Sequence, residues 1–334
     1  MRLALRKMLE SCSDIAVVGT AKDGKEGVAI AQELSPDVIT LDVEMPNMDG
    51  LQALVELLAK GPFPVVMVSS LTTAEADVTL KALDLGAVDF VTKPSSIAST
   101  DISLISNELV TKVRAAASLG REKIIQIMSD RRRAEGKIAS SGKWTKRFDL
   151  VVIGSSTGGP PALHKILGSL PPDLPCGIIV AQHMPPGFTK LLAERLNESS
   201  RLKVKEAEDG DPVTPGSCFV APAGYQTLVE GSGNELCLRV ALPGERDLYK
   251  PCVDLTMISV ANTLGRKALG IILTGMGADG AYGLKAIKDK GGFTIAESEE
   301  TCVVYGMPGK AAELGAAIRI LPLYMIPGEI CALL

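Results

Sequence analysis

The chain has 334 residues, 46% of them hydrophobic and 22% charged, and a formal net charge of −4 at pH 7. This composition predicts a folded protein of about two domains and excludes a largely disordered chain. The acidic balance and the aromatic content of only 4% disfavour a general nucleic-acid or membrane-surface binder.

Cysteine usage and hydropathy predict a cytoplasmic protein without membrane insertion. The seven cysteines form no C-x-x-C pair, and the two histidines are too few to complete a zinc cluster with them. An odd number of scattered cysteines is typical of reduced thiols in the cytosol. No apolar run reaches the roughly 18 residues of a membrane span, and residues 1–7 lack the apolar core of a signal peptide.

Residues 1–94 alternate between helical and strand patterns, which is typical of a parallel α/β sheet. The patterns predict helices over 2–10, 24–33, 50–60 and 73–85, and strands over 15–19, 37–41, 64–69 and 89–91.

Three polar residues lie at strand ends in this first unit. Asp42 follows one strand, Ser69 ends the next, and Lys93 follows the last. A carboxylate nucleophile, a hydroxyl and an ammonium group at one edge of a sheet suit the acceptance of a phosphoryl group. Each residue alone fits ordinary turn chemistry, but their joint occurrence in this order favours a phosphoacceptor site.

Residues 95–146 depart from the alternating pattern. They contain Ser/Thr-rich turns, a helical stretch near 103–118 and three arginines at 131–133. Three arginines in an acidic protein favour a solvated linker over a nucleic-acid patch. We therefore predict a first domain over 1–118, a linker over 119–146 and a second α/β domain over 147–334.

The second domain opens with the most informative stretch of the chain, residues 149–159. An apolar run leads into Gly-Ser-Ser-Thr-Gly-Gly, and two prolines and a helical pattern follow. This pattern predicts a strand, a sharp turn and a helix, with Ser156 at the turn near the positive end of the helix. Taken alone, a Gly-rich turn of this kind more often binds phosphate or simply turns the chain.

Two further strand ends favour a catalytic interpretation. His183 follows the apolar run 177–181, and Asp279 follows the strand-like run 268–275. Asp279 alone would be interpreted as the N-cap of the next helix. Three strands that each end in one member of Ser, His and Asp predict a triad, because the carboxyl ends of parallel strands form a site together.

The chemistry of these residue types assigns the roles. Ser156 attacks an acyl carbon, His183 takes its proton, and Asp279 orients the imidazole. Backbone N–H groups at the Met276 turn or around Thr157 are candidates to hold the oxyanion. The order Ser, His, acid excludes the α/β-hydrolase fold, in which the histidine comes last.

The motifs resemble two known families. The residues Leu-Asp-Val-Glu-Met-Pro at 41–46, together with Ser69 and Lys93-Pro94, resemble a response-regulator receiver domain. Four blocks of the second domain resemble the chemotaxis-receptor methylesterase family, namely 153–159, 181–188, 273–280 and 303–308. The resemblance covers nearly the whole chain and implies a flavodoxin-like receiver followed by a doubly wound α/β hydrolytic domain.

The resemblance also implies an activity and partners. Enzymes of this family hydrolyse glutamate methyl esters on chemoreceptor cytoplasmic helices, releasing methanol, and can deamidate receptor glutamines. By position, Ser156, His183 and Asp279 form the triad, the Met276 amide lies near the oxyanion, and a chemotaxis histidine kinase phosphorylates Asp42. No organic cofactor is implied, and Mg²⁺ would serve the phosphoryl transfer.

The sequence departs from the receiver pattern at its start. A receiver begins with a strand ending in acidic residues that help to bind Mg²⁺, whereas this chain opens directly in a helix. In the strand order 2-1-3-4-5 of this fold, the strand over 15–19 then loses its neighbour. Asp42 is left as a partial Mg²⁺ site without its acidic pair.

Two other functions are weaker interpretations. A non-catalytic signalling module would not need the complete set of Ser156, His183 and Asp279. A nucleotide-binding protein is disfavoured because the glycines of the turn do not fit G-x-G-x-x-G and no P-loop lysine follows. The other histidine, His164, lies about two helical turns beyond Ser156 and is predicted to be a surface or packing residue.

Overall fold

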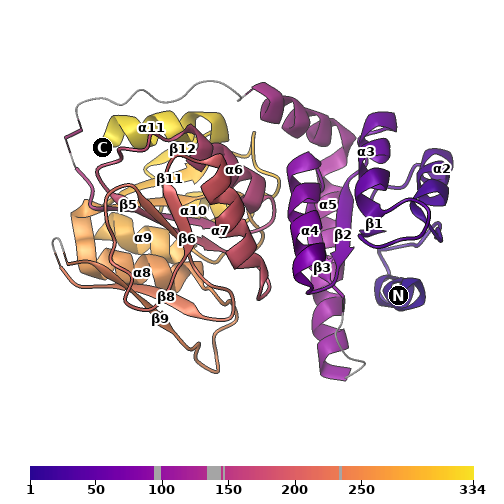
Figure 1. Ribbon diagram of the computed structural model, residues 1–334, viewed down its shortest axis with the longest axis horizontal. Coiled ribbons are helices and arrows are strands. Elements are labelled where there is room, and N and C mark those ends of the chain that lie inside the picture. Colours follow the sequence, from indigo (N-terminus) through magenta and orange to yellow (C-terminus); the bar gives the residue numbers. More distant parts are fainter. Residues whose placement is uncertain (94–98, 134–143, 146, 233–234) are drawn as a thin grey trace. The chain divides into compact units, whose positions relative to one another are not determined.

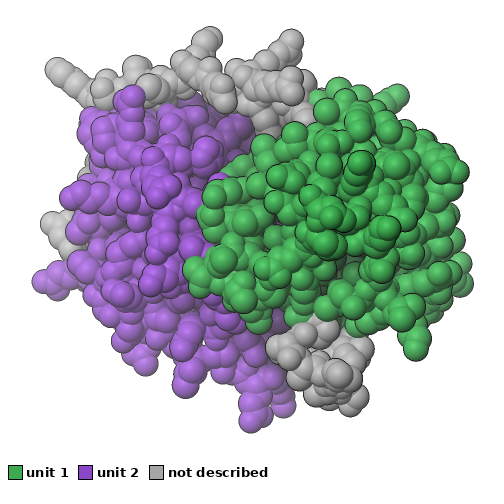
Figure 2. Space-filling model, turned by 45° about the vertical axis from the view of Figure 1, so that its right-hand side comes forward, with its two compact units in different colours: residues 1–132 green, residues 133–334 purple. Residues whose placement is uncertain are grey.

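The computed structural model describes residues 1–93, 99–133, 144–145, 147–232 and 235–334. The chain divides into two compact units, Met1–Arg132 and Arg133–Leu334, which are coloured separately in Figure 2. Each unit contains a parallel sheet flanked by helices (Figure 1), which confirms the predicted fold class of two parallel α/β domains. None of the helices in these ranges is long and apolar enough to cross a bilayer.

The first unit has a three-stranded parallel sheet in the order β1-β2-β3. The central strand β2 is wholly buried, as expected for a parallel strand covered on both faces. The strands are β1 (Ile39–Asp42), β2 (Val65–Ser69) and β3 (Asp89–Thr92), and the helices are α1 (Arg2–Glu10), α2 (Gly24–Leu34), α3 (Gly50–Lys60), α4 (Thr73–Leu85) and α5 (Ser99–Arg133).

Side-chain caps fix where three of these helices begin. Asp23, Asp49 and Thr72 each accept a hydrogen bond from the backbone N–H three residues later, at 2.9, 2.8 and 3.3 Å. These bonds satisfy donors that have no partner within the helix. These caps therefore fix the first turns of α2, α3 and α4.

Two expectations for the first half of the chain are wrong. Residues 15–19 form no strand, and Val18 is 61% exposed. A strand forms only when the backbone of a neighbouring strand pairs with it. In the described sheet β1 is an edge strand, and residues 15–19 do not pair with it. Helix α5 continues to Arg133, so 119–133 is helical where a linker was expected, with a break from helical geometry at Gly120 (φ 63°). Residues 134–143 and 146 of the expected linker lie outside the described residues.

The second unit is built on a seven-stranded parallel sheet in the order β12-β11-β10-β4-β5-β7-β6. From the central strand β4 the chain crosses first to β5 on one side and later to β10 on the other. Such a reversal opens a crevice at the carboxyl ends of the strands, where ligands bind in open α/β sheets. The strands are β4 (Leu150–Ser155), β5 (Gly177–Gln182), β6 (Lys203–Glu206), β7 (Ser217–Val220), β10 (Ala268–Ile272), β11 (Phe293–Glu297) and β12 (Arg319–Leu321).

Helices cover this sheet, and one of them also supports a hairpin. Helix α8 packs against α9, β4 and the antiparallel hairpin of β8 (Gln226–Glu230) and β9 (Cys237–Ala241), as Figure 1 shows. Leu150 and Val152 of β4 share a hydrophobic cluster with Val253 and Met257 of α8. The helices are α6 (Gly159–Ser169), α7 (Phe188–Ser199), α8 (Val253–Leu264), α9 (Ala281–Asp289), α10 (Met307–Glu313) and α11 (Ile326–Leu333), with short 3₁₀ turns at Gly265–Lys267 and Leu323–Met325.

Candidate active site

Ser156 lies at the sharp turn between β4 and α6. Its backbone N–H donates to the carbonyl of Thr274 at 3.1 Å, and its own carbonyl accepts from Gly159 at 2.7 Å. Gly158 has φ 79°, a left-handed conformation that glycine adopts without strain, and the first turn of α6 follows at once. The turn therefore presents Ser156 beside the positive end of a helix.

The segment after β10 approaches this turn closely at Gly275. A Cβ on Gly275 would lie 2.8 Å from Cβ of Ser156 and 2.3 Å from Sδ of Met307. Only glycine leaves room for such an approach, so the loop that carries Met276 is pressed against the serine turn.

His183 and Asp279 of the predicted triad lie within hydrogen-bonding distance of each other. Nε2 of His183 lies 2.7 Å from Oδ2 of Asp279, and the two side chains are only 12% and 3% exposed. When a neutral imidazole donates from Nε2, its Nδ1 atom is the acceptor. The nitrogen available to take a proton from a nucleophile is therefore Nδ1.

The N-terminus of helix α8 holds the Asp279 carboxylate. Backbone N–H groups of Val253 and Asp254 donate to it at 2.7 and 2.9 Å, and the Cys252 thiol lies 3.2 Å from Oδ1. Burial alone would raise the pKa of Asp279, but the His183 hydrogen bond and these donors outweigh it and hold that pKa below its usual value. Burial raises the pKa of Cys252 to about 12, so its thiol stays protonated and donates. The acid of the arrangement is thus ionised and fixed.

Gln182 ties the nucleophile turn to the histidine. Its amide nitrogen donates to the carbonyls of Ser156 and His183, both at 3.0 Å, and its carbonyl accepts from the Ser155 hydroxyl at 2.6 Å. In this part of the described structure, Ser156 and His183 share no side-chain hydrogen bond. Catalytic contacts of this kind are often loose before substrate binds.

The two predicted oxyanion candidates differ in their surroundings. Met276 directly follows Gly275, and its backbone N–H has no acceptor among the described residues. Thr157 is buried, and its carbonyl accepts from the Thr274 hydroxyl at 2.9 Å. A donor without a partner, next to the serine turn, is the one positioned to meet a developing negative charge.

Glu297, which the sequence does not single out, supports the Ser156 turn through Thr274. It ends β11, is fully buried, and accepts from the N–H of Thr274 at 2.8 Å and the hydroxyl of Thr301 at 2.9 Å. Burial raises its pKa. Thr274 in turn contacts the backbone of both Ser156 and Thr157. Glu297 stands in a run of acidic residues, so the sequence offers no signal that separates it from its exposed neighbours.

The first unit pairs the side chains of two of its three predicted site residues, and the backbone carbonyl of the third, Ser69, accepts from the N–H of Lys93 at 2.6 Å. Nζ of Lys93 lies 2.7 Å from Oδ1 of Asp42. The hydroxyl of Ser69 is buried and bonds instead to Thr79, at 2.7 Å, and to the carbonyl of Ser70. Lys93 and Asp42 are therefore paired, and Ser69 is engaged elsewhere.

A second carboxylate lies next to this pair. Glu75 is 5% exposed, accepts from the backbone N–H of Ser70 at 2.6 Å and from its hydroxyl, and lies 3.7 Å from Nζ of Lys93. Burial would raise the pKa of Glu75, but the Ser70 donors and Lys93 outweigh it and lower that pKa. The capping-box spacing from Thr72 to Glu75 was a signal that this side chain turns back towards the loop.

The surroundings of Asp42 do not complete a Mg²⁺ site. In the described ranges no group of three His, Cys, Asp or Glu side chains is placed to hold a metal ion. One oxygen of Asp42 already accepts from Lys93 and from the N–H of Glu44. Among the described residues, Asp42 is therefore at most a partial Mg²⁺ ligand.

Comparisons with known proteins identify the family of each unit. A model of the CheB methylesterase family matches residues 151–330, and a model of the response regulator receiver domain matches residues 1–101. A protein-glutamate methylesterase/protein-glutamine glutaminase of Archaeoglobus fulgidus is 49% identical over 99% of this chain and 94% of its own length. A protein of the same name from Symbiobacterium thermophilum is 47% identical over 99% of this chain and 93% of its own.

The chain belongs to the CheB methylesterase family.

A solved structure is similar to the second unit. The CheB methylesterase catalytic domain of Thermotoga maritima is 44% identical, has a TM-score of 0.54, and covers 56% of this chain and 99% of its own length. As a member of this family the chain is an enzyme, a carboxylic ester hydrolase joined to a receiver domain. His164 is exposed on α6, and all seven cysteines lie in the described ranges as free thiols.

Proposed function

We propose that this enzyme hydrolyses glutamate methyl esters on chemotaxis receptors to glutamate and methanol, and deamidates receptor glutamines to glutamate and ammonia. The names of its relatives support this substrate class. The observation that carries the proposal is the 2.7 Å contact between His183 and Asp279, beside the turn of Ser156, to which hydrogen bonds from Gln182 and His183 connect it.

In the proposed mechanism Ser156 is the nucleophile. Its Oγ attacks the ester carbonyl carbon while Nδ1 of His183 takes the hydroxyl proton, and the buried Asp279 carboxylate stabilises the imidazolium. The N–H of Met276, with Thr157 nearby, donates to the oxyanion. The proton then passes to the methoxy oxygen, methanol leaves, and water activated by His183 hydrolyses the acyl-serine.

For a glutamine substrate the same sequence of steps releases ammonia. The leaving amide nitrogen takes the proton from His183, and the acyl-serine that remains is identical to the one formed from the ester. The chemistry of hydrolysis needs no organic cofactor, because serine, imidazole and backbone donors supply the nucleophile, the proton carrier and the oxyanion site.

The receiver is proposed to regulate this activity. A chemotaxis histidine kinase would transfer its phosphoryl group to Asp42, and Lys93 would then pair with the phosphate. The Ser69 hydroxyl accepts from Thr79 and donates to the carbonyl of Ser70, so it must turn its proton away from Ser70 to donate to that phosphate, while the contact with Thr79 on α4 can remain. Mg²⁺ is expected in the transfer, with Asp42 as one ligand. Nucleic acid is not a proposed partner, and no membrane insertion is proposed.

The test of the hydrolase is methanol release from receptor methylated on glutamate. Ser156→Ala should lower kcat by about 10⁶-fold, to the background rate, and His183→Ala should be comparably damaging. The matched control is His164→Ala, which should keep the wild-type rate because that side chain is exposed on α6. Near wild-type methanol release from a folded Ser156→Ala protein would refute the assignment.

The test of the receiver is incorporation of phosphate from a small-molecule phosphodonor with Mg²⁺ in the buffer. Asp42→Asn should abolish the label, and the donor should change the rate of methanol release in the wild type but not in this variant. Equal labelling of both proteins would exclude Asp42 as the acceptor.

A further inference from the structure

Tyr249 lies flat against the imidazole of His183. The two ring centroids are 4.5 Å apart and the ring planes differ by only 4°. Tyr249 belongs to the segment between β9 and α8, whereas His183 follows β5. The contact therefore joins the base to a part of the chain that carries none of the three triad residues.

One buried glutamine anchors the segment that carries Tyr249. Gln226 on β8 is 4% exposed, and its amide nitrogen donates to the carbonyl of Tyr249 at 2.9 Å and to Asp247 at 3.0 Å. Its carbonyl accepts from the backbone N–H of Cys252 at 2.8 Å. All of these partners lie in residues 247–252, so Gln226 holds the segment at three points.

The same segment reaches the oxyanion turn. The Tyr249 hydroxyl lies 3.4 Å from the position that a Cβ on Gly277 would take, directly after Met276. Burial, and then the neighbouring Asp279 and Cys252, raise the pKa of Tyr249, so its hydroxyl stays neutral. The tyrosine thus extends from the base to the turn that would receive the oxyanion.

We propose that Tyr249 is a positioning residue for His183, and that Gln226 holds it in place. The inference rests on the proposed hydrolase and deepens it. The hydrogen bond from Nε2 to Asp279 does not by itself stop the imidazole from rotating about its Cβ–Cγ bond. A ring stacked at 4.5 Å blocks that rotation on one side and so limits the directions that Nδ1 can take.

The size of the effect follows from the geometry that the reaction demands. A misplacement of about 1 Å at a reacting group can lower the rate by about 100-fold. Removing the flat face should therefore lower kcat by about 10- to 100-fold and leave KM for the receptor nearly unchanged. Removing only the hydroxyl should change kcat by about twofold or less.

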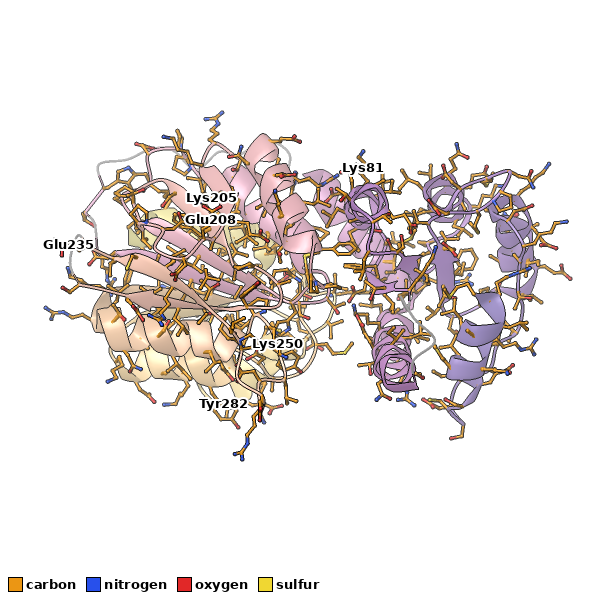
Figure 3. The ribbon with its side chains drawn as sticks, turned by 60° about the horizontal axis from the view of Figure 1, so that its bottom comes forward. Lys81, Lys205, Glu208, Glu235, Lys250 and Tyr282 are labelled. Atoms are coloured by element: carbon orange, nitrogen blue, oxygen red, sulfur yellow. The ribbon has the colours of Figure 1, made fainter. Side chains whose placement is uncertain are left out.

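The experiment compares three variants of the full chain. Tyr249→Leu removes the flat face, Tyr249→Phe keeps it, and Tyr282→Leu is the matched control. Tyr282 is 59% exposed on α9, close in sequence to Asp279, with its side chain at the surface of the unit (Figure 3). Two rates are measured: methanol release from methylated receptor, and labelling of Ser156 by a fluorophosphonate, which needs an activated serine but no receptor.

A spectroscopic readout separates positioning from a general loss of structure. The chain has only two histidines, so its imidazole Cε1–H spectrum has two signals. A stacked ring shifts the His183 signal upfield; we expect Tyr249→Leu to remove this shift, and Tyr249→Phe and Tyr282→Leu to keep it. Thermal melting should show the same unfolding temperature for all variants within a few degrees.

Support for the inference is a fall of at least about 10-fold in labelling rate and kcat for Tyr249→Leu alone. Wild-type labelling by Tyr249→Leu would overturn it, as would an equal fall in Tyr249→Phe. A failure of the proposed function would give a different result. The probe would still label Ser156 at a rate that depends on Tyr249, but the wild type would release no methanol from receptor. A wild type that does not label at all would overturn both.

Discussion

The backbone N–H of Val253 lies 2.7 Å from the carboxylate of Asp279, so the first turn of α8 holds the acid of the proposed triad. The two residues are 26 positions apart in the sequence, Val253 at the start of α8 and Asp279 in the turn before α9. The positive end of a 12-residue helix here stabilises a side chain of the protein itself, in the way that helix N-termini commonly hold bound anions. Asp279 is therefore ionised and oriented before any substrate arrives.

Replacing Asp279 by Asn should leave the fold intact and lower kcat by about 10⁴-fold. The amide can still bond to His183, but it reverses the donor and acceptor pattern and removes the charge that stabilises the imidazolium. The measurement is methanol release, with circular dichroism to verify folding. Activity within about 10-fold of wild type would show that Asp279 does not serve the histidine.

Glu297→Gln should stabilise the protein at neutral and higher pH. Burial raises the folded-state pKa of Glu297 above its ordinary value of 4.5, so its contribution to stability is present below that value and is lost as pH rises towards the folded pKa. Glutamine keeps an acceptor for Thr274 and cannot ionise. Urea midpoints should therefore diverge between variant and wild type as pH rises from 4.5 to 8. Parallel pH profiles would contradict this prediction.

Gly275→Ala should impair both folding and activity. The added methyl group would lie 2.3 Å from Sδ of Met307 and 2.8 Å from Cβ of Ser156, so the oxyanion loop or the serine turn must move. Overpacking of this kind costs about 1–3 kcal/mol of stability. Gly328→Ala is the control, because a methyl group there meets no atom within 4 Å. Equal melting temperatures and rates for the two variants would exclude a tight approach at Gly275.

Glu75→Gln should raise the rate of phosphate incorporation at Asp42 by a few-fold. The substitution removes the negative charge 3.7 Å from Lys93 and keeps an oxygen that can accept from Ser70. A partly buried ion pair of this length is worth about 1 kcal/mol, or roughly fivefold. Asp77→Asn on the same helix is the control, because its partner Lys81 lies at the surface (Figure 3). An unchanged or slower rate in Glu75→Gln would show that Glu75 does not compete for Lys93.

Sequence alone predicts those features of this protein that depend on local pattern. The buried strands and the turns after them predict that Ser156, His183 and Asp279 follow strand ends of one sheet, because parallel strands bring their carboxyl ends to one edge, and the three residues lie after β4, β5 and β10. The strand expected over 15–19 is wrong, since strand formation depends on a neighbour that no local pattern reveals.

The missed residues act through contacts between distant segments. Gln182, Glu297 and Tyr249 each look ordinary in the sequence, and only the fold brings them against the serine turn or the histidine. Glu75 is the exception, because its spacing from Thr72 follows a local capping rule. The supporting groups of a site are thus harder to predict than the groups that react.

The Gln182 amide, which bonds to the carbonyls of both Ser156 and His183, also affects how the site fluctuates. The N–H of His183 donates to the carbonyl of Ser155, and that of Ser156 to Thr274, so three strand ends are cross-linked by backbone and side-chain bonds. Opening any one of them leaves buried polar groups without partners. Amide hydrogens at the nucleophile and the base should therefore exchange with solvent only when the sheet itself opens, and at the same rate.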